Sequence, residues 1–313
     1  MESKVFFSWL VFCAIVFVML LLDLGVSHRK VREVKIKEAL LWSFIWIALA
    51  LLFNLGIYFV HGPQKALSFL TSYLIEKSLS LDNIFVFLLI FSYFRIPRLY
   101  QHTVLFWGIL GALIIRAVFI ILGLKLISRF EWVFYLFGIL LIVTGIKLAF
   151  EKDKEIQPER NLILSLFKKI VPFTQDYDDG KFFILKNGQQ FATPLLISLL
   201  VVETTDLIFA VDSIPAVLAI TVDPFIVYTS NIFAILGLRS LYFALAGMLE
   251  LFHYLHYGLS FILVFVGIKM MTKDIFHIPT IVTLGVISVV LAISIGASIG
   301  RLRNIKAKTP LAR

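Results

Sequence analysis

Cysteine and charge are both scarce in this sequence of 313 residues. Its one cysteine, Cys13, excludes a disulfide framework or a redox pair of thiols within the chain. Charged residues make up 16% of the sequence, against about a quarter in soluble domains. The sequence also has no nucleotide-binding glycine loop, no GxSxG elbow and no HExxH zinc motif. We therefore expect neither an enzyme nor an organic cofactor.

Long apolar runs fill most of the chain, in which 60% of residues are hydrophobic. A helix needs about twenty apolar residues to cross a bilayer. The runs are continuous rather than alternating, which favours helices over a closed barrel. We therefore predict an all-α integral membrane protein with about nine transmembrane helices, at residues 5–26, 39–60, 66–93, 102–124, 132–150, 193–220, 225–250, 256–272 and 278–300.

Basic residues are distributed unequally between the two sides of these spans. One side has 19 Lys and Arg residues, in residues 29–37, 95–98, 151–192 and the tail after 300, and the other side has five. Cytoplasmic loops carry the excess of positive charge. We therefore predict that the N-terminus lies outside and the C-terminus in the cytoplasm. The net charge of +9 then reflects membrane topology and indicates no nucleic acid partner.

Two parts of the sequence resemble each other. The matching pairs are 76–82 with 206–212, each beginning and ending in an acid; 107–119 with 233–243, which aligns Arg116 with Arg239; and 135–147 with 257–269, both ending in GIK. Each copy has three predicted spans, an odd number, so the two copies must be inverted in the membrane. Inverted repeats are typical of secondary transporters, whose substrate sites lie at the repeat interface near the bilayer midplane.

These matches divide the chain into five parts. We predict two N-terminal helices in residues 1–65, a first three-helix repeat in 66–150, a cytoplasmic loop in 151–192, a second repeat in 193–272, and a last helix with a basic tail in 273–313. Within the loop, Asn187-Gly188 between two apolar runs indicates a β-hairpin.

Five carboxylates lie within the third and sixth predicted spans: Glu76, Asp82, Glu203, Asp206 and Asp212. An ionised group there costs roughly 2.5–3.5 kcal/mol on insertion scales. Protonation would lower this cost, and so would pairing with Lys77, Arg116 and Arg239. Three cations cannot neutralise five anions, so protons or a bound cation must supply the difference.

The residue types around these acids indicate which cation could bind. Oxygen ligands without histidine or cysteine favour a hard divalent ion such as Mg²⁺, Ca²⁺ or Mn²⁺. Asn83 and Ser213 are candidates for additional ligands. A simpler alternative is that the acids only hold the helices together through ion pairs.

The spacing of the acids restricts how they could share an ion. Residues six positions apart on an ideal helix are about 9 Å apart along the axis and about 120° apart around it. Asp206 and Asp212 could therefore share one ion only if their helix were interrupted. Pro215 and the nearby hydroxyl residues favour such an interruption in the second copy, and the serines near Asp82 favour one in the first.

Three motifs in this chain resemble those of the TerC family, most closely its Alx-type manganese exporter branch. They are EKSLSLDNIFVF (76–87), ETTDLIFAVDSIPA (203–216) and SNIFAILGLRSLYF (230–243), and the resemblance extends from the first span through KDIFHIP (273–279). It implies a bacterial cytoplasmic-membrane protein that exports Mn²⁺, in a family linked to tellurite resistance and pH response. It also assigns the metal site to the five acids named above. Because acids outnumber bases in the membrane, we do not expect an oxyanion such as tellurite as the substrate.

We hypothesise a secondary transporter that lies among membrane lipids and exports divalent metal ions, with Mn²⁺ as the expected substrate. Arg116 and Arg239 would pair with the acids after the ion leaves, and exchange for protons is a natural coupling. A second hypothesis is a metal-binding membrane scaffold or sensor in a tellurite or metal stress complex, which would act through residues 151–192.

Overall fold

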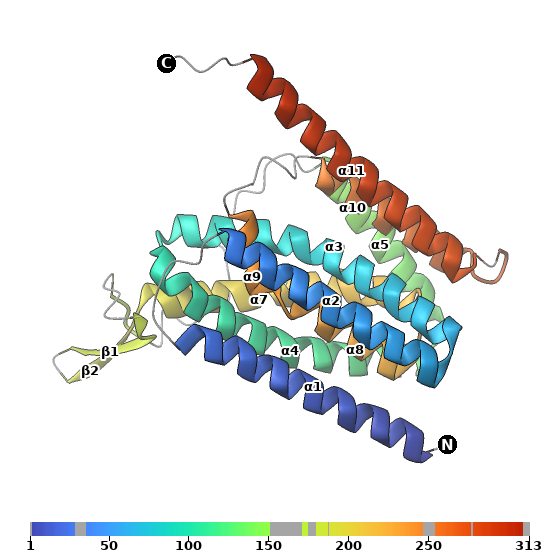
Figure 1. Ribbon diagram of the computed structural model, residues 1–313, viewed down its shortest axis with the longest axis horizontal. Coiled ribbons are helices and arrows are strands. Elements are labelled where there is room, and N and C mark those ends of the chain that lie inside the picture. Colours follow the sequence, from blue (N-terminus) through green and yellow to red (C-terminus); the bar gives the residue numbers. More distant parts are fainter. Residues whose placement is uncertain are drawn as a thin grey trace.

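The computed structural model describes residues 2–28, 36–150, 171–174, 180–186, 188–246, 254–276 and 278–308. Within these ranges it does not describe the side chains of residues 2–5, 22–28, 82, 186 and 302–308. The described helices are α1 (Glu2–His28), α2 (Ile36–His61), α3 (Pro63–Tyr93), α4 (Arg98–Arg129), α5 (Trp132–Phe150), α7 (Pro194–Leu218), α8 (Pro224–Ile235), α9 (Leu238–Leu245), α10 (Leu255–Met271) and α11 (Thr280–Lys308). Figure 1 shows α5, α10 and α11 at one side of the bundle formed by the other helices. The predicted all-α fold is confirmed.

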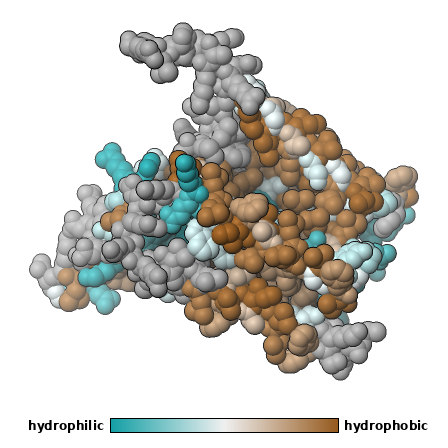
Figure 2. Space-filling model, viewed as in Figure 1, coloured by the Kyte–Doolittle hydropathy of each residue, from teal (hydrophilic) through white to brown (hydrophobic). Residues whose placement is uncertain are grey.

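The outer surface of the bundle is apolar, as a surface in contact with lipid must be. Phe59 and Phe150, for example, are 76% and 80% exposed. Figure 2 shows an apolar band over the helices on one face, with hydrophilic residues gathered toward the ends. By length and composition, six helices of the described residues could each cross a membrane: Ile36–His61, Arg98–Arg129, Trp132–Phe150, Pro194–Leu218, Pro224–Leu245 and Thr280–Arg301.

The remaining three predicted spans also correspond to helices. Two of them contain the shorter apolar helices Phe6–Leu21 and Leu255–Met271. The third is α3, whose charged residues lower its hydropathy. The count of nine spans therefore stays a prediction.

The expected interruptions of the third and sixth spans are wrong. Both α3 and α7 run as continuous helices past their acidic residues. Pro215 lies close to the C-terminal end of α7. The backbone donor that proline lacks therefore removes a hydrogen bond only near the helix end, and the helix is not interrupted. The hydroxyls of Thr204 and Thr205 donate to carbonyl oxygens one turn earlier in the same helix and so do not replace broken backbone bonds.

The break in the membrane region lies instead in the seventh predicted span, which is not the single helix expected over 225–250. Helix α8 ends at Ile235 and α9 begins at Leu238. Gly237 between them has a φ of +85°, a left-handed conformation that favours glycine. A Cβ at Gly237 would lie 2.7 Å from the ring of Trp46, so this turn also needs glycine for close packing against α2.

Helices α5 and α10 pack against each other through small residues. A Cβ on Gly267 would lie 2.7 Å from the carbonyl oxygen of Gly138, and one on Gly145 would lie 2.8 Å from that of Ser260. In the repeat alignment Gly138 corresponds to Ser260, and Gly145 corresponds to Gly267. The two close contacts are therefore counterparts of each other, as an inverted repeat requires.

The pairing of the other helices has the same regularity. Helix α4 packs on α7, and α8 packs on α3, so the first helix of each copy contacts the second helix of the other copy. This arrangement supports the inverted three-helix repeat, which stays a prediction.

A β-hairpin precedes α7 and projects beyond the ends of the helices (Figure 1). Strand β1 (Phe183–Lys186) pairs antiparallel with β2 (Gln189–Ala192), and Lys186 pairs with Gln189, which leaves two residues between the strands. Gly188 has a φ of +80°, as the predicted two-residue turn requires. Most of the remaining predicted loop, residues 151–170 and 175–179, lies outside the described residues.

Candidate functional site

Three charged side chains meet in the interior of the bundle, one from each of three helices. Arg116 of α4 forms ion pairs with Glu76 of α3 and with Asp206 of α7. Its Nη2 and Nε lie 3.0 and 3.3 Å from the two carboxylate oxygens of Asp206, a two-point contact that holds both groups in orientation. We call Glu76, Arg116 and Asp206 the buried triad.

The buried triad is closed to solvent and contains two acids for one base. Glu76 and Arg116 are 0% exposed and Asp206 is 3% exposed. Ser213 accepts a weak hydrogen bond from Arg116 Nη1 at 3.4 Å, so this predicted ligand contacts the guanidinium. One guanidinium balances only one of the two carboxylates. Because removing the cation from a buried charge group leaves uncompensated negative charge, both acids depend on Arg116.

Glu203 lies three residues before Asp206 on α7 and therefore shares its helix face. Its carboxylate lies directly against Gly111 of α4, in the space that a Cβ at Gly111 would occupy. Its Oε2 is buried and has no hydrogen-bond partner among the described residues. Gly111 thus makes room for a third acid, beside the two acids of the triad.

Asp212 lies farther along the same continuous helix. It accepts a hydrogen bond of 3.0 Å from the hydroxyl of Thr144 on α5. This contact joins α7 to α5. Because α7 is unbroken, Asp206 and Asp212 stay about 9 Å apart along its axis.

The remaining predicted site residues are Asp82, Asn83 and Arg239. Asp82 lies in α3, but its side chain is outside the described residues. Asn83 and Arg239 are buried, with 2% and 8% exposure. In the part of the chain that the structure describes, no group of three His, Cys, Asp or Glu side chains could hold a metal ion. The five-carboxylate site therefore stays a prediction, and of its described acids Glu76 and Asp206 are ion-paired with Arg116.

Lys77 does not pair with a described carboxylate. Its Nζ donates to the carbonyl oxygen of Ala234 at 3.1 Å, in the last turn of α8 before the break. Carbonyl groups at a helix C-terminus have no partner within the helix, and a positive charge stabilises them. Lys77 of α3 therefore stabilises the interrupted helix of the opposite copy.

One polar residue that the sequence analysis did not select lies beside this contact. Asn231 is 0% exposed, and neither its amide nitrogen nor its amide oxygen has a partner among the described residues. It precedes Ala234 by three residues and so lies on the same face of α8. Tyr73, one turn before Lys77 on α3, also has a buried hydroxyl without a described partner. Unpaired buried groups of this kind mark a position for water or an ion.

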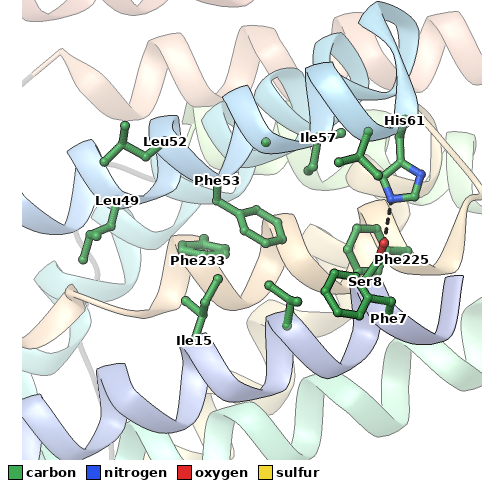
Figure 3. A pocket seen from close by; sticks show the side chains of 13 residues that line it. Phe7, Ser8, Ile15, Leu49, Leu52, Phe53, Ile57, His61, Phe225 and Phe233 are labelled. Carbon is green, nitrogen blue, oxygen red and sulfur yellow. Dashed lines mark hydrogen bonds between the residues drawn. The ribbon is translucent and has the colours of Figure 1, made fainter. Parts of the chain in front are cut away.

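A separate pocket of about 390 Å³ lies between α1, α2 and α8 (Figure 3). Its walls are aliphatic and aromatic side chains that include Phe7, Phe53 and Phe225. Ser8 and His61 supply its polar groups and are hydrogen-bonded to each other at 3.0 Å. None of the described residues that line this pocket is a carboxylate, so they cannot neutralise a divalent cation and the pocket is not the candidate ion site.

Chemically, the interior of the bundle offers oxygen atoms on facing helices, more acid than base, and one guanidinium that bridges two acids. Such a set can bind a divalent cation if Arg116 releases Glu76 and Asp206. It has no described thiol or imidazole ligand, so a softer metal would gain little from it.

Comparisons with known proteins identify relatives of this chain. Residues 61–306 match the family described as "Integral membrane protein TerC family". An uncharacterized membrane protein of Myxococcus xanthus is 54% identical over 296 residues, which cover 95% of this chain and 93% of its own. A protein of Escherichia coli strain K12, named as a candidate membrane-bound redox modulator, Alx, is 47% identical over 289 residues, with 89% and 90% of the chains covered. No solved structure gives a significant match.

Proposed function

This chain belongs to the TerC family of integral membrane proteins, and we propose that it exports divalent metal cations, with Mn²⁺ as the principal substrate. The proposed location is the bacterial cytoplasmic membrane, with the N-terminus outside and the C-terminus in the cytoplasm. The charge distribution along the sequence supports this orientation.

The buried triad is the observation that carries the proposal. It places two carboxylates, from α3 and α7, on one guanidinium from α4. These helices come from both proposed repeats, so the triad lies at their interface, where transporters of this type bind substrate. The guanidinium would stabilise the acids when no metal ion is bound, which lowers the free-energy cost of burying these carboxylates.

Binding of the metal ion would replace the guanidinium. A divalent ion brings twice the charge of Arg116 and can accept oxygen ligands from Glu76 and Asp206 together. Glu203 supplies a third acid on the same face as Asp206. Asp212, held by Thr144, lies farther along α7 and would receive the ion on its path to one side of the membrane.

The preference for Mn²⁺ rests on the donor set and on the family resemblance. All of the candidate ligands are oxygen atoms, and Asn231 adds a neutral amide oxygen to the same interior. Oxygen sites suit Mn²⁺, Mg²⁺ and Ca²⁺. We propose exchange for protons as the coupling, because carboxylates that release a divalent ion in a low-dielectric site are stabilised by binding protons.

The first test uses manganese resistance of bacteria that produce the protein. Asp212→Asn should abolish resistance while the protein still inserts in the membrane. Asp223→Asn is the matched control, because Asp223 caps α8 at the bundle end, where Asn caps equally well. A fully active Asp212→Asn variant would remove this charge from the mechanism.

The alternative function is a metal-binding scaffold or sensor. The observation in its favour is that the hairpin is attached to two helices of the candidate site. Thr193, between β2 and α7, donates its hydroxyl to the carbonyl of Lys181 at 2.8 Å. Gly180 packs against Tyr100 of α4. The hairpin is thus tied to both α4 and α7, which carry Arg116 and Asp206. The name of the Escherichia coli relative as a redox modulator is compatible with such a signalling role.

Deletion of residues 183–192 separates the two functions. A transporter should retain metal flux in membrane vesicles after this deletion, because none of its proposed ligands lies in the hairpin. A scaffold should lose its cellular effect while still binding metal. If the deletion variant folds correctly but carries no metal ion across the membrane, this result would count against the transporter.

A further inference from the structure

A cavity of about 380 Å³ lies where α7 and α10 end and α11 begins. Residues 218–222 form one wall, and Phe134 in the first turn of α5 forms another. The rest comes from the last turn of α10, the following turn and the first residue of α11. Because the ends of several helices meet there, the cavity lies at a membrane surface. It is distinct from the buried triad and from the pocket of Figure 3.

Two lysines supply the charge of this cavity. Lys269 donates from its Nζ to the hydroxyl of Thr283 at 3.0 Å, and the Nζ of Lys273 lies 4.7 Å from the centre of the Phe134 ring. Among the described residues, neither lysine forms an ion pair with a carboxylate. The neighbouring acid, Asp274, is engaged by the hydroxyl of Tyr135. The cavity therefore presents two ammonium groups and complements an anion.

The walls of the cavity indicate what kind of anion fits. Apart from the lysines and two threonines, the described lining residues are aliphatic or aromatic. Phe276, which lines the cavity, is 70% exposed, which places an apolar side chain at the mouth. A small hydrated anion would gain nothing from these surfaces. A molecule with a charged head and an apolar chain would use both.

We infer that this cavity binds an anionic glycerophospholipid, with its phosphate between Lys269 and Lys273 and the start of an acyl chain along Phe134 and Phe276. Ammonium groups form charge-assisted hydrogen bonds with phosphate oxygens, and the apolar walls suit an acyl chain. The bound lipid would join α5, α7, α10 and α11 at one membrane surface. This inference does not depend on metal transport.

Native mass spectrometry of the purified full-length protein tests it. The protein is mixed in detergent with phosphatidylglycerol, with zwitterionic phosphatidylcholine, or with inorganic phosphate. We expect one phosphatidylglycerol molecule to stay bound where phosphatidylcholine does not. The double variant Lys269→Met/Lys273→Met should bind it roughly 30-fold more weakly, because the loss of each lysine–phosphate contact should lower the affinity about fivefold.

Two further variants separate binding from folding. Lys273→Met alone, at an exposed position, should weaken binding about fivefold and leave thermal stability unchanged. Lys125→Met, at the end of α4 and outside the cavity, should bind as the wild type does. Equal retention of both lipids, displacement of the lipid by inorganic phosphate, or undiminished binding by the double variant would each overturn the inference.

Discussion

Arg116 of α4 holds Asp206 of α7 by a two-point contact, with nitrogen–oxygen distances of 3.0 and 3.3 Å. The same guanidinium forms an ion pair with Glu76 of α3. The contact thereby links the first helix of each proposed repeat through a residue of a third helix. Any movement that lets a cation reach these acids must change the position of Arg116.

Removing Arg116 should destabilise the protein more than removing the whole triad. Arg116→Met leaves two buried carboxylates without a cation, so the free energy of unfolding should fall by about 3–5 kcal/mol. The triple variant Glu76→Gln/Arg116→Met/Asp206→Asn should recover most of this loss but not transport. Thermal or denaturant unfolding in detergent measures both effects. Wild-type stability of Arg116→Met would contradict a structural role for the triad.

Gly111 should be required because of Glu203. Gly111→Ala places a methyl group in the space of the Glu203 carboxylate and should reduce transport as strongly as Glu203→Gln does. Gly108→Ala is the matched control, since its Cβ would meet a methyl group of Val202 at 3.1 Å, a contact that small side-chain movements relieve. Rates of metal flux in vesicles provide the comparison. Additive losses in the double variant Gly111→Ala/Glu203→Gln would show that the two residues act separately.

Asn231 should matter for transport and not for folding. Asn231→Leu removes an unpaired buried amide, so stability should stay equal or rise, whereas flux should fall at least about tenfold if the amide is a ligand. Asn54→Leu on α2 provides a control, because Asn54 also has a buried oxygen without a described partner. If Asn231→Leu transported at the wild-type rate, Asn231 would have no part in the site.

The contact between α5 and α10 tests the inverted repeat. Gly145→Val and Gly267→Val occupy equivalent positions and should each lower the free energy of unfolding by about 1–3 kcal/mol through overpacking. Gly285→Val and Gly296→Val on α11 should have smaller effects, since no atom of the described residues lies within 4 Å of a Cβ there. A large effect at only one of the two equivalent positions would argue against the repeat. Unfolding experiments on the four variants are sufficient.

Family, fold class and hairpin were all accessible from the sequence. The family inferred from the acidic motifs is confirmed by the match over residues 61–306. The strands β1 and β2 lie on either side of residues 187 and 188, where the Asn-Gly signal placed the turn. Long apolar runs and short turns are local features, so a single sequence is enough to locate them.

The break between α8 and α9 was misplaced because it depends on contacts between distant helices. Pro215 is the stronger local signal, but it lies near a helix end and α7 tolerates it. The actual break uses Gly237 against Trp46 of α2 and Lys77 of α3 on the carbonyl of Ala234. No local pattern reports such contacts.

The triad was predicted in part, from charge balance. The excess of acid indicated that Arg116 would pair with buried carboxylates, but the choice of Glu76 and Asp206 requires the packing of α3, α4 and α7. Asn231 was missed, although Asn-Ile-Phe occurs both at 83–85 and at 231–233. Its significance comes from being buried without a partner, which depends on how α8 packs against α3.

The most direct test of the account is metal flux through the purified protein in liposomes that contain a Mn²⁺-quenched dye. The wild-type protein should carry Mn²⁺ into the liposomes, and Asp206→Asn should reduce the rate to that of empty liposomes. The single Asp223→Asn change, at the end of the bundle, should have no effect on the rate. If the wild-type protein conducts no divalent ion, or if Asp206→Asn transports Mn²⁺ at the wild-type rate, the buried carboxylates are not a transport site.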